Sequence, residues 1–379
     1  MALGIVFLLS LGYLQRERAL RGQNDFAQLY AGARLAGTAS LYSRSANLAV
    51  IRSVHGFTME TVVYTRPPFY AALLAPLRYL PYPTAYAFFS AAMLASILWF
   101  VIRFSKECAP LPFFAAMSIP LLTALCNGQD TPLLLLILGS SILLTRRKLD
   151  FLAGLVMSLC AIKFHLFLFI PILLLCKKRW SILGGGAAGL ALLSGLGVLV
   201  NGVDSTLEYA RVLRDPWINP SPVGMPNLHG LAAALGGDVR LEVVLAGIVL
   251  AAFLWITQRT DNFEYLLAAS LVCGLLVSFH AGVSDTLVLF PAFVMTVASS
   301  DIEPLRASVA LILTPIPYFM AFAGAPYSAF LPAALLMLLG GYCVAARGRG
   351  TWNYLAAATR GAAGTPGAAG TPGAAVTRS

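Results

Sequence analysis

Residues 127–148 read NGQDTPLLLLILGSSILLTRRK, and this stretch decides the fold. A polar turn over 127–130 is followed by an uncharged, mostly apolar run over 131–145, and the basic triplet 146–148 closes it. Apolar residues bounded by a polar end and a basic end are typical of a helix that crosses a lipid bilayer. The sequence therefore predicts a membrane helix here, with chemistry at one end and positive charge at the other.

The composition of the whole chain supports the same interpretation. Of 379 residues, 59% are hydrophobic and 11% are charged, and the mean hydropathy is +0.79. Soluble domains have roughly 45–50% apolar and about 25% charged residues. A soluble enzyme is therefore excluded. The net charge of +10 indicates basic residues at membrane edges, and we expect no nucleic-acid partner.

Outward from 127–148, further apolar runs predict an all-α polytopic membrane protein with about twelve transmembrane helices of up to ~20 residues each. The expected spans are 1–14, 84–102, 110–126, 131–145, 150–162, 164–176, 181–200, 241–257, 263–279, 286–299, 304–323 and 326–346.

Basic residues follow every second span, which is the pattern of cytoplasmic loops. Both termini are then cytoplasmic, and the long connections 15–83 and 201–240 face outward. The membrane domain covers 1–346, and the Gly/Ala/Thr/Pro-rich segment 347–379 reads as a disordered cytoplasmic tail.

The first outer loop carries two further expected helices. One is amphipathic and begins near Asn24 or Asp25, either of which can cap it. The other, within 66–81, is apolar but too short to cross, so we expect it to lie in the membrane interface after Pro67 and Pro68.

This topology gathers polar and ionisable side chains at the outer face. Ionisable residues at membrane depth are costly, so a functional role is the first hypothesis for them. Each also has a structural alternative, such as a helix cap, a turn residue or a local ion pair. The residues are Asp25, Asn127, Gln129, Asp130, Lys163, His165, Asn227, His229, His280 and Asp285.

The order of these motifs resembles glycosyltransferase family 87, a family of polytopic GT-C glycosyltransferases. The resemblance covers roughly 24–290 and rests on AGARLA, YTRPPFYAALLAPLRYLP, NGQDTPLLLL, AIKFHLFLFIPILLL, PNLHGL and SFHAGVSDTLVL. The sequence departs from the family pattern at Arg66 and at His229, which puts the identity of the acceptor in doubt.

The resemblance implies a GT-C-like fold and transfer of a sugar, with mannose the family's best-known one. The donor is a polyprenyl-phosphate sugar, and the acceptor is a hydroxyl of a lipid or glycan on the extracytoplasmic side of the bacterial inner membrane. A single displacement inverts the anomeric centre and needs a base, for which Asp25 is the candidate. The expected donor-phosphate ligands are Lys163, His280 and Arg66, and the expected sugar or acceptor contacts are Gln129, Asn227, His229 and Asp285.

No paired-aspartate motif of the kind that holds a metal–nucleotide sugar occurs in the chain. We therefore expect no metal site and no required cofactor, although the sequence leaves dependence on a divalent metal ion open. The alternatives are a transporter or flippase of lipid-linked sugars, a glycan polymer ligase, and a membrane scaffold without chemistry. Transporters usually show internal repeats and midplane sites, neither of which the sequence displays.

Overall fold

The computed structural model describes residues 24–55, 63–215, 222–299 and 302–362, together with isolated positions before residue 24. Within these residues the regular secondary structure is helical and no strand is found, so the predicted all-α class is confirmed. The predicted first span, 1–14, lies outside the described residues apart from those isolated positions.

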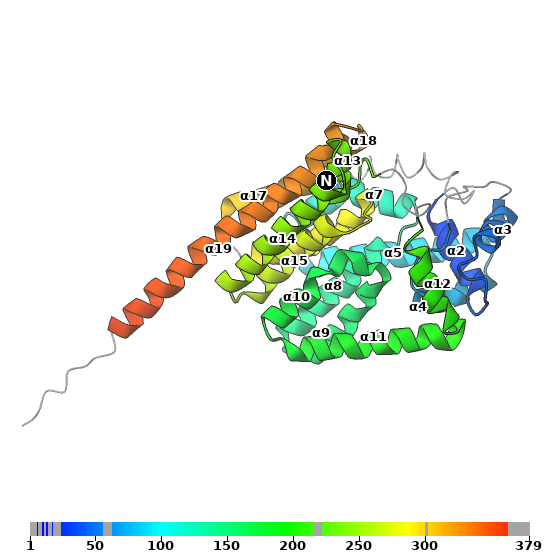
Figure 1. The fold of residues 1–379 in the computed structure, drawn as a ribbon, viewed down its shortest axis with the longest axis horizontal. Coiled ribbons are helices and arrows are strands. Elements are labelled where there is room, and N and C mark those ends of the chain that lie inside the picture. Colours follow the sequence, from blue (N-terminus) through cyan, green and yellow to red (C-terminus); the bar gives the residue numbers. More distant parts are fainter. Residues whose placement is uncertain are drawn as a thin grey trace, which may run out of the picture.

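The helices occur in the following order (Figure 1): α2 Phe26–Leu35, α3 Arg44–His55, α4 Pro68–Leu74, η1 Ala75–Tyr79, α5 Tyr82–Phe104, α6 Leu111–Ala116, α7 Ile119–Cys126, α8 Thr131–Arg146, α9 Asp150–Met157, η2 Ser158–Phe167, α10 Phe169–Cys176, α11 Trp180–Asn201, α12 Asp204–Val212, α13 Leu228–Ala234, α14 Val239–Arg259, α15 Phe263–Val277, η4 Val283–Val288, α16 Leu289–Ser299, α17 Glu303–Leu313, α18 Ile316–Phe322, η5 Tyr327–Ala329 and α19 Phe330–Ala362.

Five of these helical stretches are long and apolar enough to cross a membrane, and the bent pair α17–α18, with an angle of 47°, makes a sixth candidate. The five are Tyr82–Phe104, Asp150–Phe167, Trp180–Asn201, Val239–Arg259 and Tyr327–Arg347. The expected number of about twelve is therefore not confirmed. Helices α8, α15 and η4–α16 are apolar but shorter than a full span.

Some observed helices are shorter than the predicted spans, because local side-chain and backbone geometry interrupts them. The expected span 110–126 divides into α6 and α7, because the Ser118 hydroxyl caps α7 by accepting a hydrogen bond from Leu121 N at 3.1 Å. The predicted junction at Lys163 is a kink inside η2, where φ is −131° and ψ is 55°. Because the backbone at Lys163 is not helical, this buried side chain points in a direction that a regular helix would not allow.

The two long connections are packed together rather than extended. In Figure 1, α2, α3, α4 and α12 gather at one side of the helical body. Asn201, the last residue of α11, accepts a hydrogen bond from Gly37 N at 2.8 Å and donates one to Pro68 O at 2.9 Å. One amide thus joins the end of a long helix to both α4 and the turn after α2. The predicted helix near Asp25 is α2, and the stretch expected in the interface forms α4 and η1; its membrane position stays a prediction.

Close backbone contact fixes α9 against α11. A Cβ atom at Gly154 would lie 1.9 Å from Ile182 O, and one at Gly185 would lie 1.9 Å from Phe151 O. Helix pairs in membranes commonly approach through such small residues. Because α9 continues into η2, this contact helps to position Lys163.

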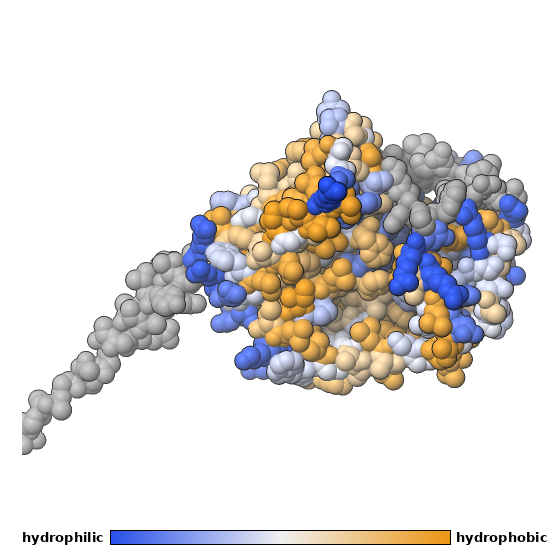
Figure 2. Space-filling view, viewed as in Figure 1, coloured by the Kyte–Doolittle hydropathy of each residue, from blue (hydrophilic) through white to orange (hydrophobic). Residues whose placement is uncertain are grey.

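The outward faces of the long helices are apolar. Hydrophobic side chains cover much of the face shown in Figure 2, and α14 alone exposes Val243 by 64% and Ile248 by 56%. Apolar surface of this extent is expected to contact lipid rather than water. Helix α19 continues to Ala362, beyond the expected span end at 346, and it extends past the other helices in Figure 1. The rest of the expected tail lies outside the described residues.

Candidate functional site

The candidate site begins at Asp25, immediately before α2. Asp25 occupies the N-cap position, yet its side chain makes no capping hydrogen bond. Instead, Gln129 Nε2 donates a hydrogen bond to Asp25 Oδ2. The adjacent Phe26 N donates to Asn127 O at 3.2 Å, so the first loop is attached to the polar turn 127–130. The Asp25 side chain stays partly exposed.

Arg66 and Asp130 form a bidentate ion pair beside it. Arg66 Nε lies 2.7 Å from Asp130 Oδ2, and Arg66 Nη2 lies 3.1 Å from Asp130 Oδ1. The Asp130 side chain is completely buried. Burial alone would raise the pKa of the Asp130 carboxyl, but Arg66 and Lys163 hold that pKa below its ordinary value.

Lys163 joins the parts of the site through its ammonium group. Its Nζ lies 3.2 Å from Asp130 Oδ1 and 2.5 Å from Asp285 Oδ1. It also donates to Thr131 Oγ1 at 2.7 Å and to Gln129 Oε1 at 3.2 Å. Two carboxylates and two neutral acceptors therefore surround this buried lysine and compensate for its lost hydration.

Asp285 lies in η4, and the fold fixes both of its oxygens. Oδ1 receives Lys163, while Oδ2 accepts a hydrogen bond from Gly282 N at 2.8 Å. The six residues joined by these contacts are called the Lys163 cluster. They are Asp25, Arg66, Gln129, Asp130, Lys163 and Asp285.

Two histidines lie next to the cluster. The rings of His165 and His280 are 6.4 Å apart between centroids. His165 Nε2 and His280 Nδ1 are buried and have no hydrogen-bond partner among the described residues. Burial lowers the pKa of His280, so its ring is neutral at physiological pH. Two imidazole rings with unused nitrogen atoms are suited to hydrogen-bond a ligand.

Asn227 and His229 are held by other parts of the protein. Asn227 is buried, caps α13 by accepting from Gly230 N at 2.8 Å, and donates to Ser278 O at 2.8 Å. His229 Nδ1 lies 2.8 Å from Glu242 Oε2. The structure does not bring either side chain into the Lys163 cluster, and their contact with sugar or acceptor stays a prediction.

The ion pairs distinguish Asp25 from the other two carboxylates. Asp130 and Asp285 are both bound to cations, whereas Asp25 forms no ion pair within the described part of the chain. Burial raises the pKa of Asp25 above its ordinary value, although Gln129 and Arg66 act in the opposite direction. A partly exposed carboxylate with a raised pKa is suited to accept a proton.

Asp130 is the one member of the cluster for which no specific role was predicted from the sequence. It directly precedes α8 and therefore looks like a helix cap, but it makes no capping hydrogen bond. Asp25 and Asp130 share this behaviour, since both hold N-cap positions and both direct their carboxylates to the cluster. Within 24–362, gaps aside, no group of three His, Cys, Asp or Glu residues has an arrangement that could hold a metal ion.

Comparison with known proteins gives one match. The family model of glycosyltransferase family 87 matches residues 64–281, which is more than half of the chain. The matched region contains Arg66, Gln129, Asp130 and Lys163, and ends just before Asp285. Neither a search of curated proteins nor a search of solved structures found a match.

Proposed function

The chain belongs to glycosyltransferase family 87 and is a membrane glycosyltransferase, and on that premise we propose that it moves a sugar, mannose in the first instance, from a polyprenyl-phosphate donor to a hydroxyl of a lipid or glycan acceptor on the extracytoplasmic face. The observation that carries this proposal is the Lys163 cluster, in which one carboxylate is available beside the cations Arg66 and Lys163.

Asp25 acts as the general base. The acceptor oxygen attacks the anomeric carbon, its proton passes to an Asp25 oxygen, and the bond from that carbon to the donor phosphate oxygen breaks. Asp130 and Asp285 are unsuited to this role because Arg66 and Lys163 neutralise them. The Gln129 hydrogen bond orients the Asp25 carboxylate toward the acceptor.

The leaving lipid phosphate gains negative charge, which donors near the cluster stabilise. Asp130 engages Nε and Nη2 of Arg66, which leaves Nη1 for the phosphate. Lys163 supplies positive charge within the cluster. The buried Nδ1 of His280 supplies a neutral hydrogen-bond donor in the tautomer that carries the proton on Nδ1. Displacement in one step inverts the anomeric configuration.

The distribution of charge along the helices supports the extracytoplasmic position. Basic residues follow α8 and α10 at the ends away from the cluster, and such residues favour the cytoplasmic side. Nucleotide sugars are absent outside the cytoplasm, so a lipid-anchored donor fits this side. In the interfacial position predicted for them, α4 and η1 would help the lipid donor to enter sideways from the membrane.

The base assignment is tested with Asp25→Asn, which keeps the Gln129 hydrogen-bond geometry but cannot take a proton. We expect transfer to fall by about 10²–10⁴-fold, the usual contribution of a positioned base. Asp204→Asn, which removes an exposed carboxylate from α12, is the matched control and should leave transfer unchanged. Near-normal turnover of purified Asp25→Asn would overturn the assignment.

The donor is identified by incubating the purified full chain with a panel of polyprenyl-phosphate sugars and reading donor cleavage by mass spectrometry. Consumption of one of these donors in the wild type and its absence in Asp25→Asn is the expected result. Failure of the whole panel, with the protein monodisperse and reconstituted, would contradict the proposed donor class.

A further inference from the structure

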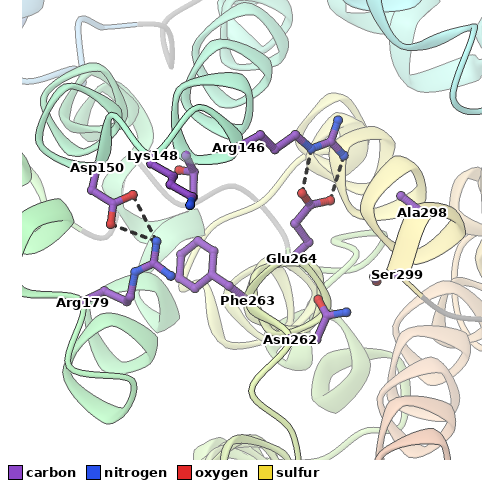
Figure 3. A pocket seen from close by; sticks show the side chains of 10 residues that line it. Arg146, Lys148, Asp150, Arg179, Asn262, Phe263, Glu264, Ala298 and Ser299 are labelled. Atoms are coloured by element: carbon purple, nitrogen blue, oxygen red, sulfur yellow. Dashed lines mark hydrogen bonds and ion pairs between the residues drawn. The ribbon is translucent and has the colours of Figure 1, made fainter.

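A second polar pocket lies at the opposite helix ends from the Lys163 cluster. Helix α8 has Asp130 at one end and Arg146 at the other, which separates them by about 24 Å at ~1.5 Å per residue. The pocket, here called the Lys148 pocket, has a volume of about 750 Å³. Its lining includes Arg146, Lys148, Asp150, Arg179, Asn262, Phe263 and Glu264 (Figure 3).

The arginines in this pocket are already engaged by carboxylates. Arg146 binds Glu264 through Nε at 2.6 Å and through Nη2 at 2.8 Å. Arg179 binds Asp150 at 3.0 and 3.1 Å and lies 4.6 Å from the ring centroid of Phe263. These pairs join α8 to α15 and α9 to α11. The two arginines therefore connect the helices around the pocket and are not free to bind a ligand.

Lys148 is the remaining cation of the pocket. Its side chain projects between the two ion pairs in Figure 3, and it forms no ion pair with any described residue. Asn262 uses its side-chain oxygen to cap α15 at Tyr265 N, 3.1 Å away, so its amide NH₂ can donate to a ligand. An ammonium and an amide donor in one pocket are suited to an anion.

The backbone conformation at Lys148 recurs at a second lysine outside the pocket. Lys148 has a φ of 61°, in the left-handed region that glycine adopts most easily. Lys178 has the same kind of geometry, with a φ of 52°, in the corresponding turn after α10, but it does not line the pocket. The chain therefore contains its own control, which is a lysine in the same strained position outside the site.

Apolar side chains at the same ends of α9 and α11 place the pocket at a lipid surface. Trp180 is 60% exposed, Phe151 is 49% exposed and Leu152 is 45% exposed. These residues directly follow Asp150 and Arg179, which line the pocket. Exposed tryptophan beside basic residues is typical of the depth of lipid head groups.

We propose that the Lys148 pocket binds a phosphate group, supplied by the head group of an anionic phospholipid, through the Lys148 ammonium and the Asn262 amide. Basic pockets between membrane helices bind such head groups, and each cation near an anionic surface contributes about 1 kcal/mol. This site is independent of the proposed sugar transfer, because it lies at the opposite helix ends and shares no residue with the Lys163 cluster.

The test compares Lys148→Gly with Lys178→Gly in the full chain. Both changes place glycine where a lysine has a left-handed backbone conformation, so both proteins should be at least as heat-stable as the wild type. The proteins are reconstituted in nanodiscs of equal parts phosphatidylglycerol and phosphatidylcholine, and retained lipids are counted by native mass spectrometry. Lys148→Gly should retain about fivefold less phosphatidylglycerol than Lys178→Gly, which removes the same charge outside the pocket; this difference corresponds to ~1 kcal/mol.

Additional arms separate the possible sources of the phosphate. Wild type in pure phosphatidylcholine is titrated with sodium phosphate, and its thermal unfolding is followed. A phosphate-dependent rise that requires Lys148, without retained phosphatidylglycerol, supports the pocket but assigns it to a soluble phosphate. The proposal is overturned if both glycine variants lose lipid equally, or if the wild type shows no preference for phosphatidylglycerol and no response to phosphate.

Discussion

Lys163 shows how one residue organises a buried polar site in a largely apolar protein. Its ammonium reaches Asp130, Asp285, Gln129 and Thr131, which come from separate stretches of the chain. A buried charge is tolerated only when its partners compensate for the lost hydration. The cluster therefore depends on its balance of charges more than on any single contact.

Removal of Lys163 should expose that dependence. Lys163→Met leaves Asp285 as an uncompensated buried carboxylate, so we expect the free energy of unfolding to fall by about 3–5 kcal/mol. Adding Asp285→Asn should recover much of this loss, because Asp130 keeps Arg66 as its partner. Chemical unfolding in detergent micelles measures both, and a double variant no more stable than Lys163→Met would contradict the interpretation.

The raised pKa of Asp25 predicts the pH dependence of transfer. A base must be ionised, so transfer is complete above the pKa of Asp25 and is lost as pH falls through it. Burial places that pKa above the ordinary 3.8. The pKa of Asp130 is instead held low by Arg66 and Lys163, so the ion pairs persist at a pH where Asp25 is already protonated.

The measurement is the initial transfer rate against pH, with tryptophan fluorescence recorded on the same samples. We expect the acid limb of the rate to lie above pH 3.8 and to precede any unfolding. A limb that coincides with unfolding would assign the loss to the fold rather than to the base.

At the scale of elements, the sequence predicted helices better than it predicted their ends. The apolar runs around α5, α8, α11 and α14 were located correctly, since hydrophobicity alone determines them. The break between α6 and α7 depends on one serine side chain capping a helix, which composition cannot show. Contacts between distant elements could likewise not be predicted from the sequence, so the ion pair between Asp130 and Arg66 was missed.

Packing of α9 on α11 gives a prediction from two neighbouring glycines. Gly185 touches the backbone of α9, while no atom lies within 4 Å of the Cβ position of Gly184. Gly184→Ala should stabilise α11 by up to about 1 kcal/mol through helix propensity. Gly185→Ala should destabilise the protein by about 1–3 kcal/mol, as overpacking does.

Because α9 leads into η2, Gly185→Ala should also reduce transfer by displacing Lys163, whereas Gly184→Ala should not. Thermal unfolding and transfer rates on the same preparations check both statements. Equal behaviour of the two variants would show that the α9–α11 contact does not control the site.

At the scale of the whole molecule, the helices connect two polar ends of different character. One end holds the Lys163 cluster, and the other holds the Lys148 pocket with its ion pairs. The sequence anticipated this polarity from alternating basic loops, because charge at helix ends is a local property. It could not show that the polar residues of each end meet, since that depends on how the helices pack.

The orientation of the two polar ends across the membrane is tested with single cysteines at the two ends of α8. Asn127 and Arg147 are both exposed and flank the helix, so Asn127→Cys and Arg147→Cys should lie on opposite faces of the membrane. The exposed Cys176 is first replaced by serine to remove background labelling. In intact cells or sealed vesicles of known orientation, an impermeant maleimide should label position 127 from the outside, and position 147 only after the membrane is permeabilised. Labelling of both positions from the same side would mean that α8 does not cross the bilayer, and the assignment of the Lys163 cluster to the extracytoplasmic face would then fail.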